Sequence, residues 1–452
     1  MMMAFLFIGI IIMIGGISGY AIIHANAQPS NLQQMNFSDT EEVFSKEGIL
    51  KASITAGYHR GNVNDKPITA MVFNNSLVGP TLNVNPGDRI ELTLINALNK
   101  STNLHFHGLH VSPSNNSDNI FIEVAPGKTQ TYVINLPVDH PPGTFWYHSH
   151  MHELSYEQVS AGLSGLIVIQ GLEELLPASL HGIKVQTFAM RDFPVTSDPS
   201  VSTFRTVNGK VDPEFNITTG ETQFWRLANI GSETFYKIAI PGHKFYVIAE
   251  DGSPVWDIWD SAELLLPSGK RYDVLVTASE NGSYPVKALD YYPYPETTIA
   301  SMNIHGDVKD SPKSIPKSFT PSKDLGLVKI NATRELNFSS NEEVGKYMIN
   351  DKIFDPNRTD QQVRLGAVEE WKLINLDEDE HPFHIHVNDF QVISVNGKPY
   401  EAHGLQDTVV IPGHGEVVIR IPFEDFVGKS VYHCHIMFHG DGGMMGVFEV
   451  VS

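Results

Sequence analysis

Short stretches in which apolar and polar residues alternate recur along the whole chain and are separated by Pro-Gly turns. Residues 130–136, 273–277 and 416–421 are examples, and each is rich in β-branched and other apolar residues. Alternation with a period of two predicts strands that bury one face. Apolar spacing typical of long helices is scarce, so the pattern predicts an all-β protein.

A frame of one glycine, one leucine and one asparagine recurs three times. Leu follows Gly after seven residues and Asn follows it after nine, in the segments NPGDRIELTLINAL (85–98), TTGETQFWRLANIG (218–231) and RLGAVEEWKLINLD (364–377). Repetition on this scale indicates repeated domains. We therefore expect three consecutive β-sandwiches over 46–171, 172–308 and 324–452, with a linker rich in Pro, Ser and Lys at 309–323.

The N-terminus combines an apolar run at 4–23 with an Ala-Asn-Ala sequence at 25–27. This is typical of a signal peptide over 1–27, followed by a polar linker over 28–45. The run is also about long enough to span a bilayer, so an uncleaved anchor is the alternative and the only membrane contact that we expect. Either way the globular part is predicted to be exported and extracytoplasmic.

The repeat also aligns a set of histidines. Positions nine and eleven residues beyond the marker asparagines are His105 and His107 in the first copy and His384 and His386 in the third, whereas the middle copy has Ile238 and Ile240. A second His-x-His pair follows in the same two copies, at 148–150 and 433–435. The middle domain is thus predicted to have the scaffold without the metal positions.

These four pairs predict a metal centre. His-x-His on a strand places two imidazoles side by side on one face, and a single pair would be weak evidence because hydrogen-bonded histidines are commoner than ligands. Four pairs at matching positions reverse that judgement. Cys434, the only cysteine of the chain, lies between His433 and His435 and points to the opposite face. The thiolate and the imidazoles therefore serve two sites that a few covalent bonds connect, and electrons would pass between them.

The residues around Cys434 favour copper. Two imidazoles, a thiolate and a weak axial methionine are typical of blue copper sites, and zinc cannot carry electrons. His439 and Met444 follow Cys434 by five and ten residues, and His381 supplies the second imidazole. Met445 is the alternative axial residue.

Four motifs together resemble those of the three-domain multicopper oxidases, the laccase-like and metallo-oxidase group: HFHG (105–108), HSH (148–150), HPFHIH (381–386) and HCHIMFHGDGGM (433–444). The resemblance implies cupredoxin-like Greek-key domains and four copper ions. It implies that the type 1 ligands are His381, Cys434, His439 and Met444, and the type 2 ligands His105 and His384. The type 3 pair would be held by His107, His148 and His435 on one ion and by His150, His386 and His433 on the other.

The resemblance further implies an oxidoreductase that takes single electrons from a phenolic or aromatic donor, or from Fe(II) or Cu(I), and reduces O2 to water. Asp118 stands where the family commonly has an acid near the cluster, although an Asp in an Asn/Ser loop otherwise favours turns. Many relatives have Glu directly after the histidine that matches His439. This chain has Gly440, so that relay is absent or has moved to Asp441.

The charge and the acidic run DEDE (377–380) bear on partners. A formal net charge of -21 excludes nucleic acid as an expected partner. The run directly precedes His381 and either binds a cationic donor, accepts a proton from a phenol, or is a solvated loop. A copper nitrite reductase would have two domains and no histidine at 435, and a copper-free binding protein would have lost ligands. The sequence does not predict the oligomeric state.

Overall fold

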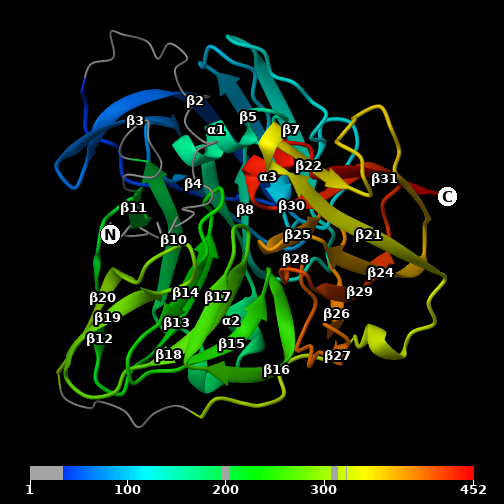
Figure 1. Ribbon diagram of the computed structural model, residues 1–452. Coiled ribbons are helices and arrows are strands. Elements are labelled where there is room, and N and C mark those ends of the chain that lie inside the picture. The colour runs from blue at the N-terminus through cyan, green and yellow to red at the C-terminus, as the bar shows by residue number, and fades with distance from the viewer. Residues whose placement is uncertain (1–33, 195–202, 307–313, 322) are drawn as a thin grey trace, which may run out of the picture.

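The computed structural model describes residues 34–194, 203–306, 314–321 and 323–452, which form three β-sandwiches that contact one another (Figure 1). The predicted signal peptide or anchor lies outside these residues. Within the described part of the chain, no helix is long and apolar enough to cross a membrane. The expectation of an all-β protein is confirmed, since α1, α2 and α3 have only 7, 4 and 5 residues.

The first domain packs a five-stranded sheet, in the order β1-β4-β9-β8-β6, against a four-stranded sheet, β3-β2-β5-β7. Its elements are β1 (Glu42–Phe44), β2 (Ile49–Val63), β3 (Lys66–Phe73), β4 (Gly79–Val84), β5 (Arg89–Asn96), β6 (His105–His107), β7 (Thr129–Asn135), β8 (Gly143–His148), α1 (Ser155–Ala161) and β9 (Ser164–Ile169). The predicted linker 28–45 is therefore wrong at its end, because β1 pairs in parallel with β4 and belongs to the sandwich.

The middle domain repeats this plan with a six-stranded sheet, β11-β10-β13-β18-β15-β16, and a five-stranded sheet, β12-β20-β19-β14-β17. α2 (Leu172–Leu175) and η1 (Ala178–Leu180) lead into it. Its strands are β10 (Val185–Pro194), β11 (Thr203–Val207), β12 (Glu214–Thr218), β13 (Thr222–Asn229), β14 (Tyr236–Ala239), β15 (Phe245–Glu250), β16 (Ser253–Ser261), β17 (Glu263–Leu266), β18 (Arg271–Thr277), β19 (Gly282–Leu289) and β20 (Thr297–His305).

The third domain has the sheets β22-β21-β24-β29-β26-β27 and β23-β31-β30-β25-β28. Its elements are η2 (Leu325–Leu327), β21 (Ala332–Asn341), η3 (Glu342–Val344), β22 (Lys346–Ile349), β23 (Gln361–Arg364), β24 (Ala367–Asn375), β25 (His381–Ile385), β26 (Gln391–Val395), β27 (Lys398–Pro399), β28 (Thr408–Ile411), β29 (Glu416–Phe423), β30 (Gly428–Cys434), α3 (Met437–Asp441) and β31 (Met445–Val451). The described part of the predicted linker contacts the middle domain, where Phe319 N donates to Trp256 O.

The repeated Gly and Asn have the same structural role in all three domains. Each glycine, at 87, 220 and 366, has a φ near +80°, which a residue without Cβ adopts without strain, and the turn leads into β5, β13 or β24. The marker asparagine ends that strand and is buried. Its amide donates to a carbonyl four or five residues ahead and to one on a more distant segment, as Asn96 does to Lys100 and Val124. This bond fixes the loop that leads to the next strand, which carries the histidines in two of the domains.

Candidate metal centre

The predicted histidine pairs lie on adjacent strands in the first and third domains. In the first domain β6 pairs with β8 and His105 lies opposite His148. In the third domain β25 pairs with β30 and His384 lies opposite His433. The two strand pairs face each other, so the structure brings together eight buried histidines from segments as far apart as 328 positions.

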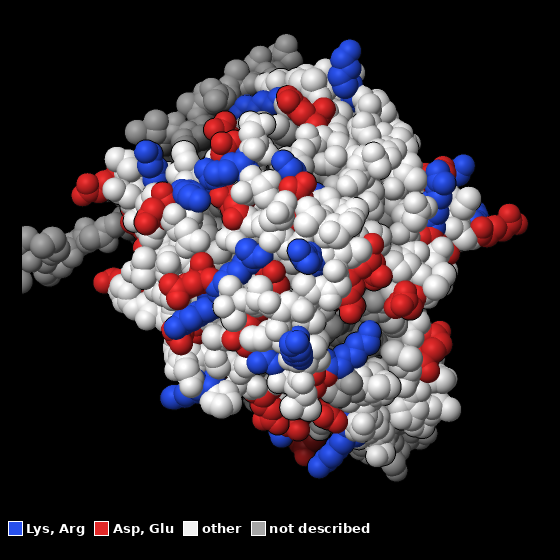
Figure 2. Space-filling model, turned by 90° about the vertical axis from the view of Figure 1, so that its right-hand side faces the viewer, with Lys and Arg blue, Asp and Glu red and all other residues white. Residues whose placement is uncertain are grey.

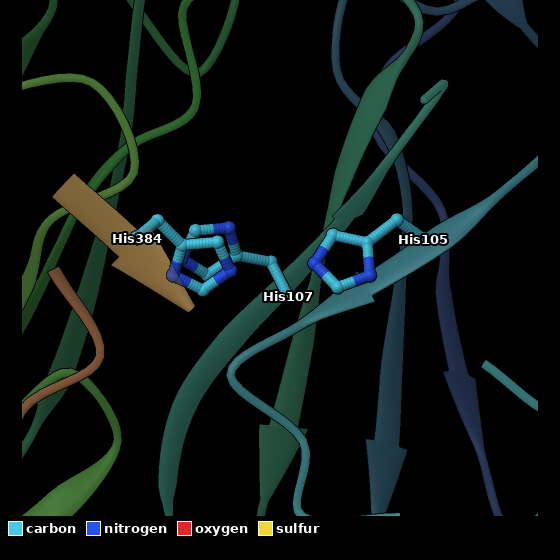
Figure 3. A group of neighbouring side chains, drawn as sticks. All are labelled: His105, His107 and His384. Atoms are coloured by element: carbon cyan, nitrogen blue, oxygen red, sulfur yellow. The ribbon is translucent and has the colours of Figure 1, made fainter. Parts of the chain in front are cut away.

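The eight side chains form overlapping groups whose ligand atoms lie within 4.8 Å of one another. Three of these groups contain only histidine: His105, His107 and His384; His107, His148 and His435; and His150, His386 and His433. His107 and His384 come from different domains and their rings stack at 3.7 Å, while His105 lies beside them on the strand of His107 (Figure 3). A fourth group, His105, His386 and Asp118, adds a carboxylate.

The nitrogen atoms that face the centre fit metal ligands. The Nε2 atoms of His105, His148 and His384 are buried and have no hydrogen-bond partner in the part of the chain that the structure describes. Nε2 of His433 lies 3.1 Å from Nε2 of His150 and 3.2 Å from that of His386. Burial, and then neighbouring histidines, lower the pKa of His105 and His435 well below the usual value, and burial lowers those of His148 and His433 to about 3. These four imidazoles are therefore neutral and offer lone pairs to a cation.

Most of the nitrogens on the far side of these rings are hydrogen-bonded. Nδ1 of His105 lies 2.9 Å from Asp118 Oδ1, and Nε2 of His107 lies 3.1 Å from Asp407 Oδ1. Nδ1 of His384 donates to the Asp407 carbonyl, and Nδ1 of His435 donates to Ser268 Oγ at 3.0 Å. The sequence analysis missed Asp407 and Ser268, since neither lies in a histidine motif. The repeated Asn frame gives no signal for them.

Asp118 contacts the centre, whereas Asp441 does not. Asp118 also accepts from Phe106 N, and its burial raises its pKa to about 8. The Asp441 carboxylate accepts from the backbone N–H groups of Ser155 and Tyr156 at the start of α1 and so ties the third domain to the first. Among the described residues, no hydrogen bond joins Asp441 to a histidine of the centre.

Cys434 lies on the other face of β30, as the alternation predicts. Its Sγ is 3.6 Å from Nδ1 of both His381 and His439, whose Nδ1 atoms are 3.2 Å apart. Burial raises the pKa of the thiol, so a bound cation is needed to stabilise the thiolate. Met444 belongs to the buried cluster that contains Cys434, whereas Met445 packs with Val431 and Val447 in another. This arrangement favours Met444 as the axial residue.

Two residues of the acidic run 377–380 form hydrogen bonds with other side chains, and the other two are exposed to solvent. Asp377 Oδ2 lies 3.0 Å from Nε2 of His381, the nitrogen that points away from Cys434. Burial opposes ionisation of Asp377, but the hydrogen bonds from His381 and from Ser340 N outweigh it and lower its pKa. Glu380 accepts from the Tyr291 hydroxyl at 2.5 Å. Glu378 and Asp379 are exposed.

One face of the molecule has basic and acidic side chains side by side. Figure 2 shows Lys and Arg interspersed with Asp and Glu over the face that it presents. This face therefore has charges of both signs rather than one continuous acidic patch. The carboxylate next to His381 is that of Asp377.

Comparisons with known proteins agree with the geometry. Three family models, each described as multicopper oxidase, match residues 55–174, 173–305 and 319–452. A multicopper oxidase of Staphylococcus aureus is 28% identical over 413 residues, which are 87% of this chain and 86% of the relative. An iron transport multicopper oxidase of Candida albicans is 26% identical, over 90% and 76% of the two chains. A solved multicopper oxidase from Campylobacter jejuni, described as a metallo-oxidase, has a TM-score of 0.77 at 25% identity and covers 93% of this chain and 98% of its own.

Proposed function

Because the chain belongs to the multicopper oxidase family, we propose that it oxidises a one-electron donor next to His381 and uses the electrons to reduce O2 to water at the eight-histidine centre. Copper is the cofactor and the chain is an oxidoreductase that uses O2. The three sandwiches do not support the two-domain nitrite reductase alternative, and the retained ligand set does not support a copper-free binding protein.

The geometry and the family resemblance together support an assignment of ligands. The type 1 ion would be held by His381, Cys434, His439 and Met444, and the cluster by the eight paired histidines, with His105 and His384 on type 2 copper. When bound, copper at the cysteine site accepts single electrons, and the three ions of the cluster supply the electrons that O2 reduction needs.

Two features of the chain support electron and proton transfer between these sites. Cys434 is bonded through the backbone to His433 and His435, and both imidazoles face the cluster, so the covalent path between the sites is short. Asp118 holds Nδ1 of His105 at 2.9 Å and is fully buried, which places an exchangeable proton beside the cluster. These side chains hold the ligands in place and exclude water, while the metal carries out the redox chemistry.

The proposed class of electron donor rests on the contact between Asp377 and Nε2 of His381. A carboxylate on the outer edge of the type 1 histidine suits a metal cation, because it attracts the cation and compensates the charge that the cation gains on oxidation. We therefore infer that the donor is Fe(II) or Cu(I). The laccases among the relatives make a phenol the second candidate, in which case Asp377 would accept the phenolic proton.

The test compares oxygen uptake with ferrous ion, cuprous ion and a methoxyphenol. For a metal-ion donor we expect Asp377→Asn to raise KM for the metal ions about tenfold, in line with the loss of roughly 1.4 kcal/mol of binding, and to leave KM for the phenol nearly unchanged. Asp379→Asn is the matched control, since Asp379 is exposed in the same run. Higher kcat/KM for the phenol in the wild type, or equal effects of both variants, would contradict a metal-ion donor.

We also propose that the chain is exported. The sequence at 4–27 supports export, as either a cleaved signal peptide or an anchor. Expression in an exporting host followed by mass measurement of the purified chain separates these two, because cleavage after residue 27 removes the whole apolar run. Retention of the full-length chain in the cytoplasm would contradict export.

A further inference from the structure

No described residue of the middle domain belongs to a group that could hold a metal ion, but the domain contacts the metal centre directly. Residues 267–270 connect β17 to β18, and Ser268 and Gly269 of this loop lie against histidines of the cluster. Ser268 Oγ donates to the Gly231 carbonyl at 2.6 Å, so its lone pair is free to accept the proton on Nδ1 of His435 at 3.0 Å. Both side chains are fully buried. A proton fixed on Nδ1 leaves Nε2 of His435 without a proton, and Nε2 is the atom that faces the cluster.

Gly269 brings the backbone of the middle domain against two ligand rings. Its φ is +90°, and a Cβ placed there would lie 3.0 Å from Cε1 of His107 and 3.1 Å from the ring of His435. Any side chain at this position would displace a ligand. The middle domain therefore forms one wall of the cluster.

Arg271 connects the three domains through its guanidinium group. Nε donates to Thr144 O of the first domain, and Nη1 donates to Gly269 O of the middle domain. Nη1 also donates to Asp407 Oδ1 of the third domain at 3.0 Å, and Nη2 forms an ion pair with Asp407 Oδ2 at 2.8 Å and donates to Asp251 O. The guanidinium thus donates four hydrogen bonds and adds an ion pair with Asp407, so that it binds groups of all three domains.

The carboxylate that Arg271 holds also contacts a histidine of the cluster. Asp407 Oδ1 accepts the proton on Nε2 of His107 at 3.1 Å, and Asp407 O accepts from Nδ1 of His384. His107 consequently turns Nδ1 toward Nε2 of His435, at 3.2 Å. The other seven histidines turn Nε2 toward the cluster. In three of them Nε2 has no hydrogen-bond partner among the described residues, and in the other four it contacts Nε2 of another histidine or Nδ1 of His107.

We propose that Ser268 and Arg271 of the middle domain are positioning residues that select the nitrogen atoms by which His435 and His107 bind copper, so that the copper-free domain determines how completely the cluster is loaded. The inference rests on the proposed copper cluster. A histidine held with its proton on the wrong nitrogen must be rearranged before it binds a metal. Loss of a hydrogen-bond partner of this kind typically lowers metal affinity 10- to 100-fold.

The test uses the full chain with Ser268→Ala and Arg271→Lys. The matched control is Arg226→Lys, because Arg226 is also buried, also donates to Thr144 and forms ion pairs with Asp273 and Glu173, but contacts no histidine among the described residues. Copper per chain is measured after equilibration in graded copper buffers. Thermal unfolding is followed with and without copper, together with the blue absorption and the near-ultraviolet absorption of the type 3 pair.

We expect Ser268→Ala to bind cluster copper about 10- to 100-fold more weakly, to keep the blue absorption, and to lose most of the rise in unfolding temperature that copper gives the wild type. Arg271→Lys should show the same pattern more strongly if it folds, and Ser268→Ala tests the proposal if it does not. Arg226→Lys should lower both unfolding temperatures equally. Wild-type copper affinity and type 3 absorption in Ser268→Ala would overturn the inference. A wild-type chain without blue absorption would instead refute the proposed function.

Discussion

The first and third domains build a buried group of three polar side chains at the same place in the fold, and only one of the groups suits a metal. Thr102 and His381 each lie six residues after the marker asparagine. Ser149 directly follows His148, and Cys434 directly follows His433. Each of these two histidines lies opposite a histidine of the neighbouring strand. The third member comes from the following helix, Gln158 in α1 and His439 in α3.

In both groups the three side chains converge on one point, but their chemistry and spacing differ. In the first domain Ser149 Oγ and Thr102 Oγ1 donate to Gln158 Oε1 at 2.5 and 2.7 Å, so donors meet an acceptor. In the third domain the sulfur and two imidazole nitrogens meet at 3.2 to 3.6 Å, and all three are ligand atoms. The scaffold fixes the positions, and the residue types decide whether hydrogen bonds or a metal stabilise them.

At the positions of the histidine pairs, the middle domain has apolar residues instead. Ile238 lies opposite Ala288 where the third domain has His384 opposite His433, and both are buried in the core of the sandwich. The same architecture thus tolerates a metal site, a hydrogen-bonded group or a hydrocarbon core. The middle domain has no histidine at these positions, but its residues Ser268 and Arg271 contact the ligands, or the partners of the ligands, in the third domain.

The largest expected effect comes from giving the third domain the residue of the first, Cys434→Ser. A serine hydroxyl does not ionise to bind copper as a thiolate does, so we expect loss of the blue absorption and of turnover with every donor, while three coppers per chain remain. Visible absorption, oxygen uptake and copper content check this. Turnover at the wild-type rate would show that Cys434 is not the entry point for electrons.

His148→Ala tests whether the first domain contributes only to the cluster. His148 flanks Ser149 as His433 flanks Cys434, but its Nε2 faces the histidine centre. We expect the blue site to remain reducible by the donor and its reoxidation by air to slow by about 100-fold or more, the upper range for disturbed metal ligation. Stopped-flow absorption measures both steps. Wild-type reoxidation would mean that the cluster is assigned wrongly.

Gln158→Ala breaks the hydrogen-bonded group without touching a proposed ligand. The hydroxyls of Thr102 and Ser149 would lose their shared acceptor in a buried place, which costs about 1–3 kcal/mol for an unsatisfied group. Urea unfolding of the copper-free chain should show this loss, and the blue absorption of the loaded chain should be unchanged. A weakened blue band would indicate that the first-domain group is coupled to the type 1 site.

The smallest effect concerns the loop after the marker asparagine. This loop exposes Glu378 and Asp379 in the third domain but leaves Glu233 only partly exposed in the middle domain. Burial and then Asp192 raise the pKa of Glu233 to about 7, although a hydrogen bond from the Tyr156 hydroxyl opposes the rise. The folded chain therefore keeps a proton that the unfolded chain releases above about pH 4.3. The free energy of unfolding should fall as pH rises from about 4.3 to about 7.

Glu233→Gln should remove this decline, because the amide does not titrate. The free energy of unfolding of the copper-free wild type and variant is measured at pH 5 and pH 7.5. At the higher pH the variant should be more stable relative to the wild type than at the lower pH. Parallel pH profiles would show that Glu233 is ionised in the folded chain. Asp379→Gln at the exposed counterpart should leave the profile unchanged.

Much of the fold and most of the candidate ligands were predictable from the sequence because they depend on local rules. Alternation with a period of two identified strands that the structure confirms, such as β7, β18 and β29. The Gly and Asn of the repeat control a turn and a loop within a few residues, so equivalent positions were found by counting. His-x-His and the intervening Cys434 point to opposite faces for the same local reason.

Only the tertiary structure decided which histidines of the first and third domains meet, and which partners hold the far side of their rings. Ser268, Arg271 and Asp407 lie outside every motif and act because a loop of the middle domain packs against the cluster. Packing also favoured Met444 over Met445 and tied Asp441 to α1. Strand periodicity determines the direction of a side chain, but its partners depend on long-range burial and hydrogen bonding, which no local pattern specifies.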